Sequence, residues 1–219
     1  MKKSFIVIGL GRFGLSVVNQ LAKQTNQLIA VDVDEKRVDL IKGEVEQCFC
    51  CDCTNKNVLE ELNVSKIDHA IVAIGNNLEA TILTTMNLKE LGVKKVTVRI
   101  DETKYENLLK RVGADVVIVP EEDAGIELAK KVVSDSILDY YQVDKEYGVV
   151  QISIPNNFKE QSLIELDARN KFDVNIVGVI RNKSFFIPKG QDKVQPNDVI
   201  MVVGKSNKII KFDNYVNKW

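Results

Sequence analysis

The chain has 219 residues, enough for one large domain or for two smaller ones with separate cores. Charged residues make up 28% and hydrophobic residues 45% of the sequence, which is usual for a soluble globular protein. A formal net charge of −1 provides no global basic field, so nucleic acid is not expected as a partner. No apolar run approaches the roughly 20 residues that span a bilayer, so we expect a cytosolic protein.

The first predicted element is a buried strand, 5–8, which runs into the sequence Gly9-Leu10-Gly11-Arg12-Phe13-Gly14 and then into a helix. A Gly-x-Gly-x-x-Gly turn between a strand and a helix is typical of dinucleotide-binding folds. Gly9 is expected to permit the turn, Gly11 to let a diphosphate approach the backbone, and Gly14 to let the helix pack on the strand. Free N–H groups at the start of the helix would then face the anion.

The second predicted strand, 27–32, ends in Asp32, which lies 18 residues beyond Gly14. A carboxylate at about this spacing accepts hydrogen bonds from two ribose hydroxyls and repels a 2′-phosphate. Asp32 therefore favours NAD, NADH or an adenine nucleotide over NADP. The alternative is that Asp32 only caps the helix that starts near Asp34.

The first 120 residues read as short alternating strands and helices. In chain order we predict strand 5–8, helix 15–22, strand 27–32, helix 35–42, strand 47–50, helix 56–62, strand 69–75, a helix with the apolar stripe Ala80, Ile82, Leu83, Met86, Leu88 and Leu91, strand 95–100, helix 105–112 and strand 116–119. This order predicts an α/β domain with a doubly wound, Rossmann-like parallel sheet over 1–121.

Polar residues follow several of these strands, at the edge where an open parallel sheet binds its ligand. Asp52 comes just after strand 47–50, and it is interpreted equally as a partner of adenine or its ribose and as the cap of helix 56–62. Asn76 and Asn77 follow strand 69–75, and Arg99 lies at the end of strand 95–100.

Four cysteines are crowded into six residues: Cys48, Cys50, Cys51 and Cys53. Their spacing fits neither a paired zinc motif nor an iron–sulfur motif. Cys48 and Cys50 suit alternate positions on a short strand, where cysteine acts as a small apolar residue. Metal or redox chemistry at this cluster is the less favoured alternative.

The remainder of the chain changes character. A long helix through Ile126 and Leu138 is predicted over 122–140, within a connecting segment 122–146. A smaller α+β domain, 147–219, follows, with strand 148–154, a Ser162-capped helix 163–171, strands 174–180, 184–187 and 199–203, and a final amphipathic segment 206–216.

The second domain offers little of the chemistry of a dehydrogenase. Such an enzyme needs a proton donor or acceptor beside the nicotinamide, usually His, Lys or Tyr, and this domain contains no histidine and no cysteine. A nucleotide site without reactive groups favours a sensor, in which binding energy moves a structure.

Several segments together resemble the regulator-of-potassium-conductance (RCK) family, whose two domains are also called TrkA-N and TrkA-C. The likeness covers nearly the whole chain and rests on Ile8 to Gly14, Val31 to Asp34, Asp52 to Thr54, Val72 to Asn77, Gly113 to Asp115, and Pro120 with Glu121. The resemblance extends to the cytosolic regulatory subunits of bacterial potassium uptake systems.

This resemblance implies a role for each motif residue. Gly9, Gly11 and Gly14 would lie under the phosphates, with Asp32 at the ribose and Asp52 near the adenine. Phe13, Cys53, Asn76, Asn77 and Arg99 would belong to the same crevice. Cys53 departs from the family pattern, in which small or apolar residues are usual.

Two further residues resemble family contacts to the end of the nucleotide. Arg12 is similar to the arginine that reaches the terminal phosphate of ATP, although a surface arginine near a helix start is the alternative. Glu121 is similar to a carboxylate that holds a divalent cation, Mg²⁺ or Ca²⁺, although stabilisation of a helix N-terminus also accounts for it.

The second domain resembles the region in which related TrkA-C domains bind cyclic di-AMP across a dimer interface. The matching positions are Arg169, Asn175, Ile176 and Pro188, and simple edge exposure is the alternative for Asn175.

The resemblance further implies homodimers that assemble into an octameric ring on the cytosolic face of a membrane potassium-translocating subunit (KtrB- or TrkH-like), with ATP activating and ADP inactivating. The glycines and Asp32 serve ATP/ADP and NAD/NADH alike. An NAD-dependent dehydrogenase and an NADH redox sensor that uses the cysteines therefore stay open as alternatives.

Overall fold

The structure is a computed structural model that describes residues 3–75, 77–132, 134–144 and 146–218. It contains two compact units, Met1–Glu122 and Asp123–Trp219. Among the described residues, every helix is too short or too polar to cross a bilayer.

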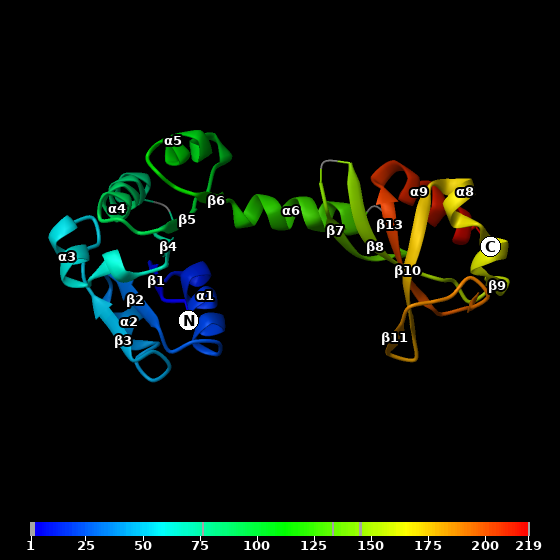
Figure 1. Cartoon of the computed structure of the whole chain (residues 1–219), viewed down its shortest axis with the longest axis horizontal. Helices are drawn as coiled ribbons and strands as arrows, with labels where there is room; N and C mark the ends of the chain where they lie inside the picture. The colour runs from blue at the N-terminus through cyan, green and yellow to red at the C-terminus, as the bar shows by residue number, and fades with distance from the viewer. Residues whose placement is uncertain (1–2, 76, 133, 145, 219) are drawn as a thin grey trace. The chain divides into compact units, whose positions relative to one another are not determined.

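The first unit alternates strands and helices as predicted (Figure 1). Its elements are β1 (Phe5–Ile8), α1 (Arg12–Ala22), β2 (Leu28–Asp32), α2 (Glu35–Asp39), β3 (Gln47–Cys50), α3 (Lys56–Glu61), β4 (His69–Val72), α4 (Leu78–Glu90), β5 (Lys95–Arg99), α5 (Glu106–Arg111) and β6 (Val116–Ile118). Two 3-10 turns, Val64–Lys66 and Thr103–Tyr105, precede β4 and α5.

The six strands form one parallel sheet in the order β3-β2-β1-β4-β5-β6. Ile8 pairs with Val31 on one side and with Val72 on the other, so β1 and β4 end level and β2 extends one residue further, to Asp32. The strand order reverses between β1 and β4, and a doubly wound sheet binds ligands beyond its carboxyl ends at such a point. The predicted fold class is confirmed.

Helices cover both faces of this sheet, and alternate strand residues supply the two cores. Ile6 and Ile8 pack with residues of α3, α4 and α5, such as Leu59, Leu88 and Leu109. Val7 packs on the other face with residues of α1 and α2, including Val18 and Val38. Burial on both faces explains why these strands are almost continuously apolar.

The face of helix α4 (Leu78–Glu90) that packs against the core differs from the predicted apolar stripe. Its buried side chains are Thr81, Thr84, Thr85 and Leu88, whereas Leu83 is 41% and Met86 38% exposed. The Thr81 and Thr85 hydroxyls donate to helix carbonyls one turn back, at 2.8 and 2.6 Å, which makes their burial inexpensive. The apolar stripe prediction is therefore wrong in part, because threonines face the core where Leu83 and Met86 were expected.

The second unit is built on an antiparallel sheet in the order β11-β10-β13-β8-β7. Its elements are β7 (Ile137–Gln142), β8 (Tyr147–Ser153), β9 (Gln161–Ser162), α7 (Leu163–Leu166), α8 (Ala168–Phe172), β10 (Val174–Arg181), β11 (Ser184–Phe186), β12 (Lys193–Val194), β13 (Val199–Lys205) and α9 (Ser206–Val216). The Ser162 cap is confirmed, but Asp167 at φ +50° divides the predicted helix 163–171 into α7 and α8.

The helix predicted over 122–140 is wrong in its second half. Helix α6 (Pro120–Lys131) ends early, and 137–142 form strand β7, which pairs with β8. Between them, the Ser134 and Ser136 hydroxyls donate to the buried carboxylate of Asp213, at 2.8 and 2.5 Å. Serine side chains that bond elsewhere compete with helix formation, so the chain leaves the helix at this point.

Candidate nucleotide site

The glycine turn after β1 has the geometry that its sequence predicts. Gly9 has φ +97°, and a Cβ atom there would lie 2.6 Å from the Ala73 backbone carbonyl at the end of β4. A Cβ atom on Gly14 would lie 1.8 Å from the Gly9 carbonyl oxygen, so only glycine lets α1 pack this closely. A Cβ atom on Gly11 would meet nothing within 4 Å, which leaves open space over the turn.

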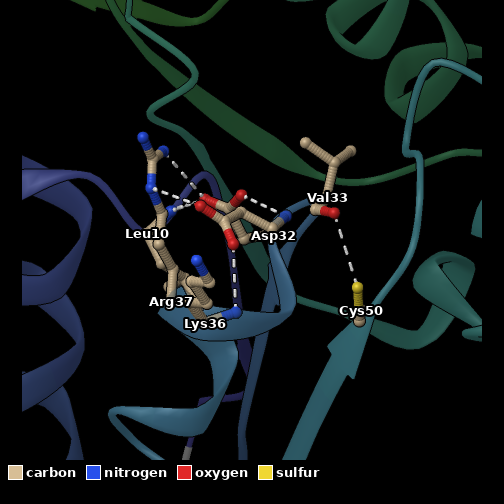
Figure 2. A network of polar contacts seen from close by, with 7 residues as sticks. Leu10, Asp32, Val33, Lys36, Arg37 and Cys50 are labelled. Carbon is tan, nitrogen blue, oxygen red and sulfur yellow. Dashed lines mark hydrogen bonds and ion pairs between the residues drawn. The ribbon is translucent and has the colours of Figure 1, made fainter.

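Asp32 ties the end of β2 to this turn (Figure 2). The residue is 5% exposed. Its Oδ2 accepts a hydrogen bond from the Leu10 N–H at 2.6 Å, and its Oδ1 accepts one from the Asp34 N–H at 2.9 Å. Arg37 Nη1 lies 3.5 Å from Oδ2. A carboxylate has about four acceptor positions, so two short bonds leave capacity for ribose hydroxyls.

Neither Asp32 nor Asp52 caps the helix that follows it, although capping was the alternative role for both. Asp34, not Asp32, caps α2 by accepting from the Lys36 N–H. Asn55, not Asp52, caps α3 by accepting from the Asn57 N–H. Both aspartates are therefore left for other roles at the ligand edge of the sheet.

A pocket of about 480 Å³ lies at this edge. The predicted residues that line it are Gly9, Asp32, Asp52, Cys53 and Asn77. The Asn77 side chain also caps α4 by accepting from the Ala80 N–H at 3.0 Å. The structure thus brings together residues from the ends of β1 to β4, which are distant in sequence.

A second group of predicted residues lies outside this pocket, where α1 and α6 begin. Arg99 Nη2 pairs with Glu121 at 2.5 Å, and its Nη1 pairs with Asp101 at 2.6 Å. A hydrogen bond from its own backbone N–H, then Arg99 and the charge of Arg12, hold the pKa of Glu121 below its ordinary value. Arg99 and Glu121 therefore form an ion pair, and the charge of Arg12 acts on the same carboxylate.

Arg12 is the first residue of α1 and is exposed. Within the described residues, no side chain caps this helix end and its first turn carries no acid. A helix N-terminus attracts anions and disfavours a cation. An arginine at this position is therefore most favourable when an anion lies between its guanidinium and the helix N-terminus. Phe13 follows in the same turn and is half-buried, whereas Asn76 lies outside the described residues.

Comparison with known proteins identifies the family. The model of the TrkA-N domain matches residues 5–120, more than half of the chain, and that of the TrkA-C domain matches residues 149–217. The chain belongs to the TrkA-N/TrkA-C family. The predicted resemblance is confirmed.

Relatives of known name extend over the whole chain. Ktr system potassium uptake protein C of Bacillus subtilis (strain 168) is 36% identical over 217 residues, which cover 99% of this chain and 98% of that protein. Ktr system potassium uptake protein A of Vibrio alginolyticus is 32% identical over 208 residues, or 94% of each chain.

Solved structures agree in fold. The GsuK channel matches with a TM-score of 0.70 at 12% identity, covering 99% of this chain and 39% of that chain. The GsuK channel bound to NAD matches with a TM-score of 0.65, the same identity and the same coverage. The TrkA-N/TrkA-C chain thus spans less than half of these channel chains, and at this identity they show the fold alone.

The cysteines of the TrkA-N domain are free thiols. Cys48 and Cys50 lie on β3, as predicted, and the Cys50 thiol donates to the Val33 carbonyl at 3.5 Å (Figure 2). Burial raises the pKa values of Cys51 and Cys53, which disfavours the reactive thiolate.

The divalent cation expected at Glu121 stays a prediction. The Glu121 carboxylate is already paired with Arg99. Within the described ranges, no group of three His, Cys, Asp or Glu side chains is arranged to hold a metal ion.

The TrkA-C domain has a pocket of its own, of about 450 Å³. Arg169, Asn175 and Ile176 line it, whereas Pro188 is not among the lining residues. Asn175 is exposed on β10 at a point where β11 does not pair, since the pairing with β11 covers only residues 179–181. Asn175 is thus both exposed beside the unpaired part of the sheet edge and part of the pocket lining.

Several site residues escape sequence reasoning. Arg37, Thr54, Glu79 and Leu83 line the TrkA-N pocket, and Asp101 anchors Arg99. Thr54 and Asp101 each lie two residues from a predicted site residue, so their nearness to strand ends was a usable signal. Whether Glu79 and Leu83 face the pocket depends on the rotation of α4 about its axis, and the apolar stripe predicts a different rotation.

Proposed function

We propose that this chain is the cytosolic regulatory subunit of a Ktr-type potassium uptake system, which it gates by sensing adenine nucleotides. The proposal draws on relatives that are 30% or more identical over nearly their whole length and are named as Ktr potassium uptake proteins. Their names describe transport and no reaction, which favours a regulatory role over an enzyme.

The observation that carries the nucleotide role is the pairing of an adenosine-sized pocket with an uncapped, arginine-bearing helix start. The pocket supplies Asp32 and Asp52 for the nucleoside, and α1 supplies N–H groups and Arg12 for the phosphates. A planar guanidinium offers paired donors to the third phosphate of ATP, which ADP lacks. A ligand shifts the equilibrium between two conformations of the protein only when it binds one of them more tightly than the other.

The regulatory role also requires assembly. In this proposal, homodimers form an octameric ring that binds a membrane potassium-translocating subunit, and ATP favours the conducting state while ADP favours the closed one. Sensing of NAD/NADH is the alternative, since a structure of similar fold is a channel bound to NAD.

Potassium flux tests the proposal directly. The chain should be reconstituted in vesicles with the membrane subunit of the same uptake system, and flux should be high with ATP and low with ADP. Equal flux with ATP, ADP and no nucleotide would contradict gating by adenine nucleotides, and a response to NADH alone would favour the alternative.

A second ligand, cyclic di-AMP, is proposed for the TrkA-C pocket, because Arg169 and Asn175 there match the expected positions and can meet a phosphate and a base. In the same flux assay, cyclic di-AMP should alter the ATP-supported rate. Arg169→Ala should remove this response and leave the ATP response intact, while the exposed Lys211→Ala serves as control. Equal cyclic di-AMP responses in both variants would argue against this pocket.

A further inference from the structure

The loop between β3 and α3 carries Asp52 into the pocket and is held by a turn of its own. Asp52 Oδ1 accepts hydrogen bonds from the Thr54 N–H at 2.9 Å and from the Thr54 hydroxyl at 2.8 Å. Both residues line the pocket. The position of the Asp52 carboxylate is therefore coupled to the position of the Thr54 backbone.

Helix α4 anchors this backbone from outside the pocket. Asn87 Nδ2 donates to the Thr54 carbonyl oxygen at 2.9 Å, although the two residues are 33 positions apart. The bond is part-buried, and Asn87 is not among the lining residues. One turn further along α4, Glu90 pairs with Lys56 at 2.7 Å, but both side chains are about half exposed, and such surface pairs contribute little.

The same helix also supplies a wall of the pocket, through Glu79 and Leu83. A helix is a rigid element, so the hydrogen bond from Asn87 helps α4 to hold the Asp52 loop at a fixed distance from that wall. Without this bond, the Thr54 carbonyl loses its donor in a part-buried place, and the loop loses one of its restraints toward α4.

We propose that Asn87 is a positioning residue for the adenosine end of the nucleotide pocket, acting through Thr54 on Asp52. The inference rests on the proposed function, since it assumes that an adenine nucleotide occupies this pocket. Asn87 touches no ligand in this account, and its effect on binding passes through the loop.

Calorimetry of the full chain tests this role. Asn87→Ala should weaken ATP and ADP binding equally, by about 3- to 10-fold, the loss that corresponds to one neutral hydrogen bond. Binding of inorganic triphosphate, which contacts only the phosphate end, should not change. Asn19→Ala, at an exposed position on α1, is the matched control and should bind all three ligands as the unmodified chain does.

A double-mutant cycle separates positioning from a general loss of structure. In an Asp52→Ala background, Asn87→Ala should have no further effect on ATP affinity, because the carboxylate that it positions is gone. Asn87→Asp, which is isosteric but turns an acceptor toward the Thr54 carbonyl, should reproduce the loss. It provides a second variant if the alanine variant folds poorly.

The outcomes are distinguishable. If the unmodified chain binds ATP and Asn87→Ala binds it equally well, or if the two substitutions are additive, or if triphosphate binding falls in parallel, the positioning role is overturned alone. If the unmodified chain binds no adenine nucleotide, both this inference and the proposed function are overturned.

Discussion

Replacing Arg12 by alanine should weaken ATP binding about 10- to 100-fold and leave ADP binding within about twofold, because a charge-assisted bond to the third phosphate contributes ~1.5–3 kcal/mol. Arg12 opens α1 beside the Arg99–Glu121 pair, away from the pocket that would hold the nucleoside. ADP ends before it reaches this position in our account. Calorimetric titration of each nucleotide measures the difference.

Two comparisons sharpen this experiment. Arg12→Lys keeps the charge but loses the paired donors, so its ATP affinity should fall between those of the unmodified chain and the alanine variant. Arg111→Ala removes an exposed arginine from α5 and should change neither affinity. The fold should survive Arg12→Ala, since a cation at a helix N-terminus does not stabilise the helix. Equal losses of ATP and ADP affinity would contradict the assigned role.

Replacing Gly14 by alanine should have the largest effect on stability in the TrkA-N domain. The added methyl group would lie 1.8 Å from the Gly9 carbonyl oxygen, so α1 must move away from the turn. We expect a loss of about 3 kcal/mol in unfolding free energy, at the upper end of the range for overpacking, together with loss of nucleotide binding. Hydrogen exchange of the β1 and β4 amides measures the stability of this domain separately.

Gly11→Ala is the matched control, because its methyl group meets nothing within 4 Å. Gly11 also has an extended conformation, φ −67° and ψ −174°, that alanine adopts readily. Its unfolding free energy should fall by less than about 1 kcal/mol. ATP affinity should nevertheless fall about 10-fold or more, since the methyl group occupies the space left for the phosphates. Normal ATP binding by Gly11→Ala would place the phosphates elsewhere.

The parallel sheet could be predicted from the sequence because its signals are local. Each strand is a short apolar run, and each turn carries glycine or a polar residue where the ligand edge requires it. The strand β7 could not be predicted in this way. Ile137 and Leu138 extend the apolar pattern of the preceding helix, and only pairing with β8 and the bonds from Ser134 and Ser136 to Asp213 decide against that helix.

The candidate site divides in the same manner. Gly9, Asp32 and Asp52 lie at the end of a strand or within two residues of it, so the topology alone brings them to one edge. Arg37 and Glu79 reach the pocket from helices, where a small rotation decides which side chain faces inward. The bond from the Leu10 N–H to Asp32 links the glycine turn to the end of β2, and no local pattern reveals it.

The central claim is that this chain reads a nucleotide by its phosphate tail and does not transform it. Calorimetric competition among ATP, ADP, NADH and NAD, with the ligands recovered and quantified afterwards, tests this claim most directly. We predict that ATP displaces ADP and both dinucleotides, and that every ligand is recovered unchanged. Equal affinity for ATP and ADP, or oxidation of NADH during the titration, would contradict the claim.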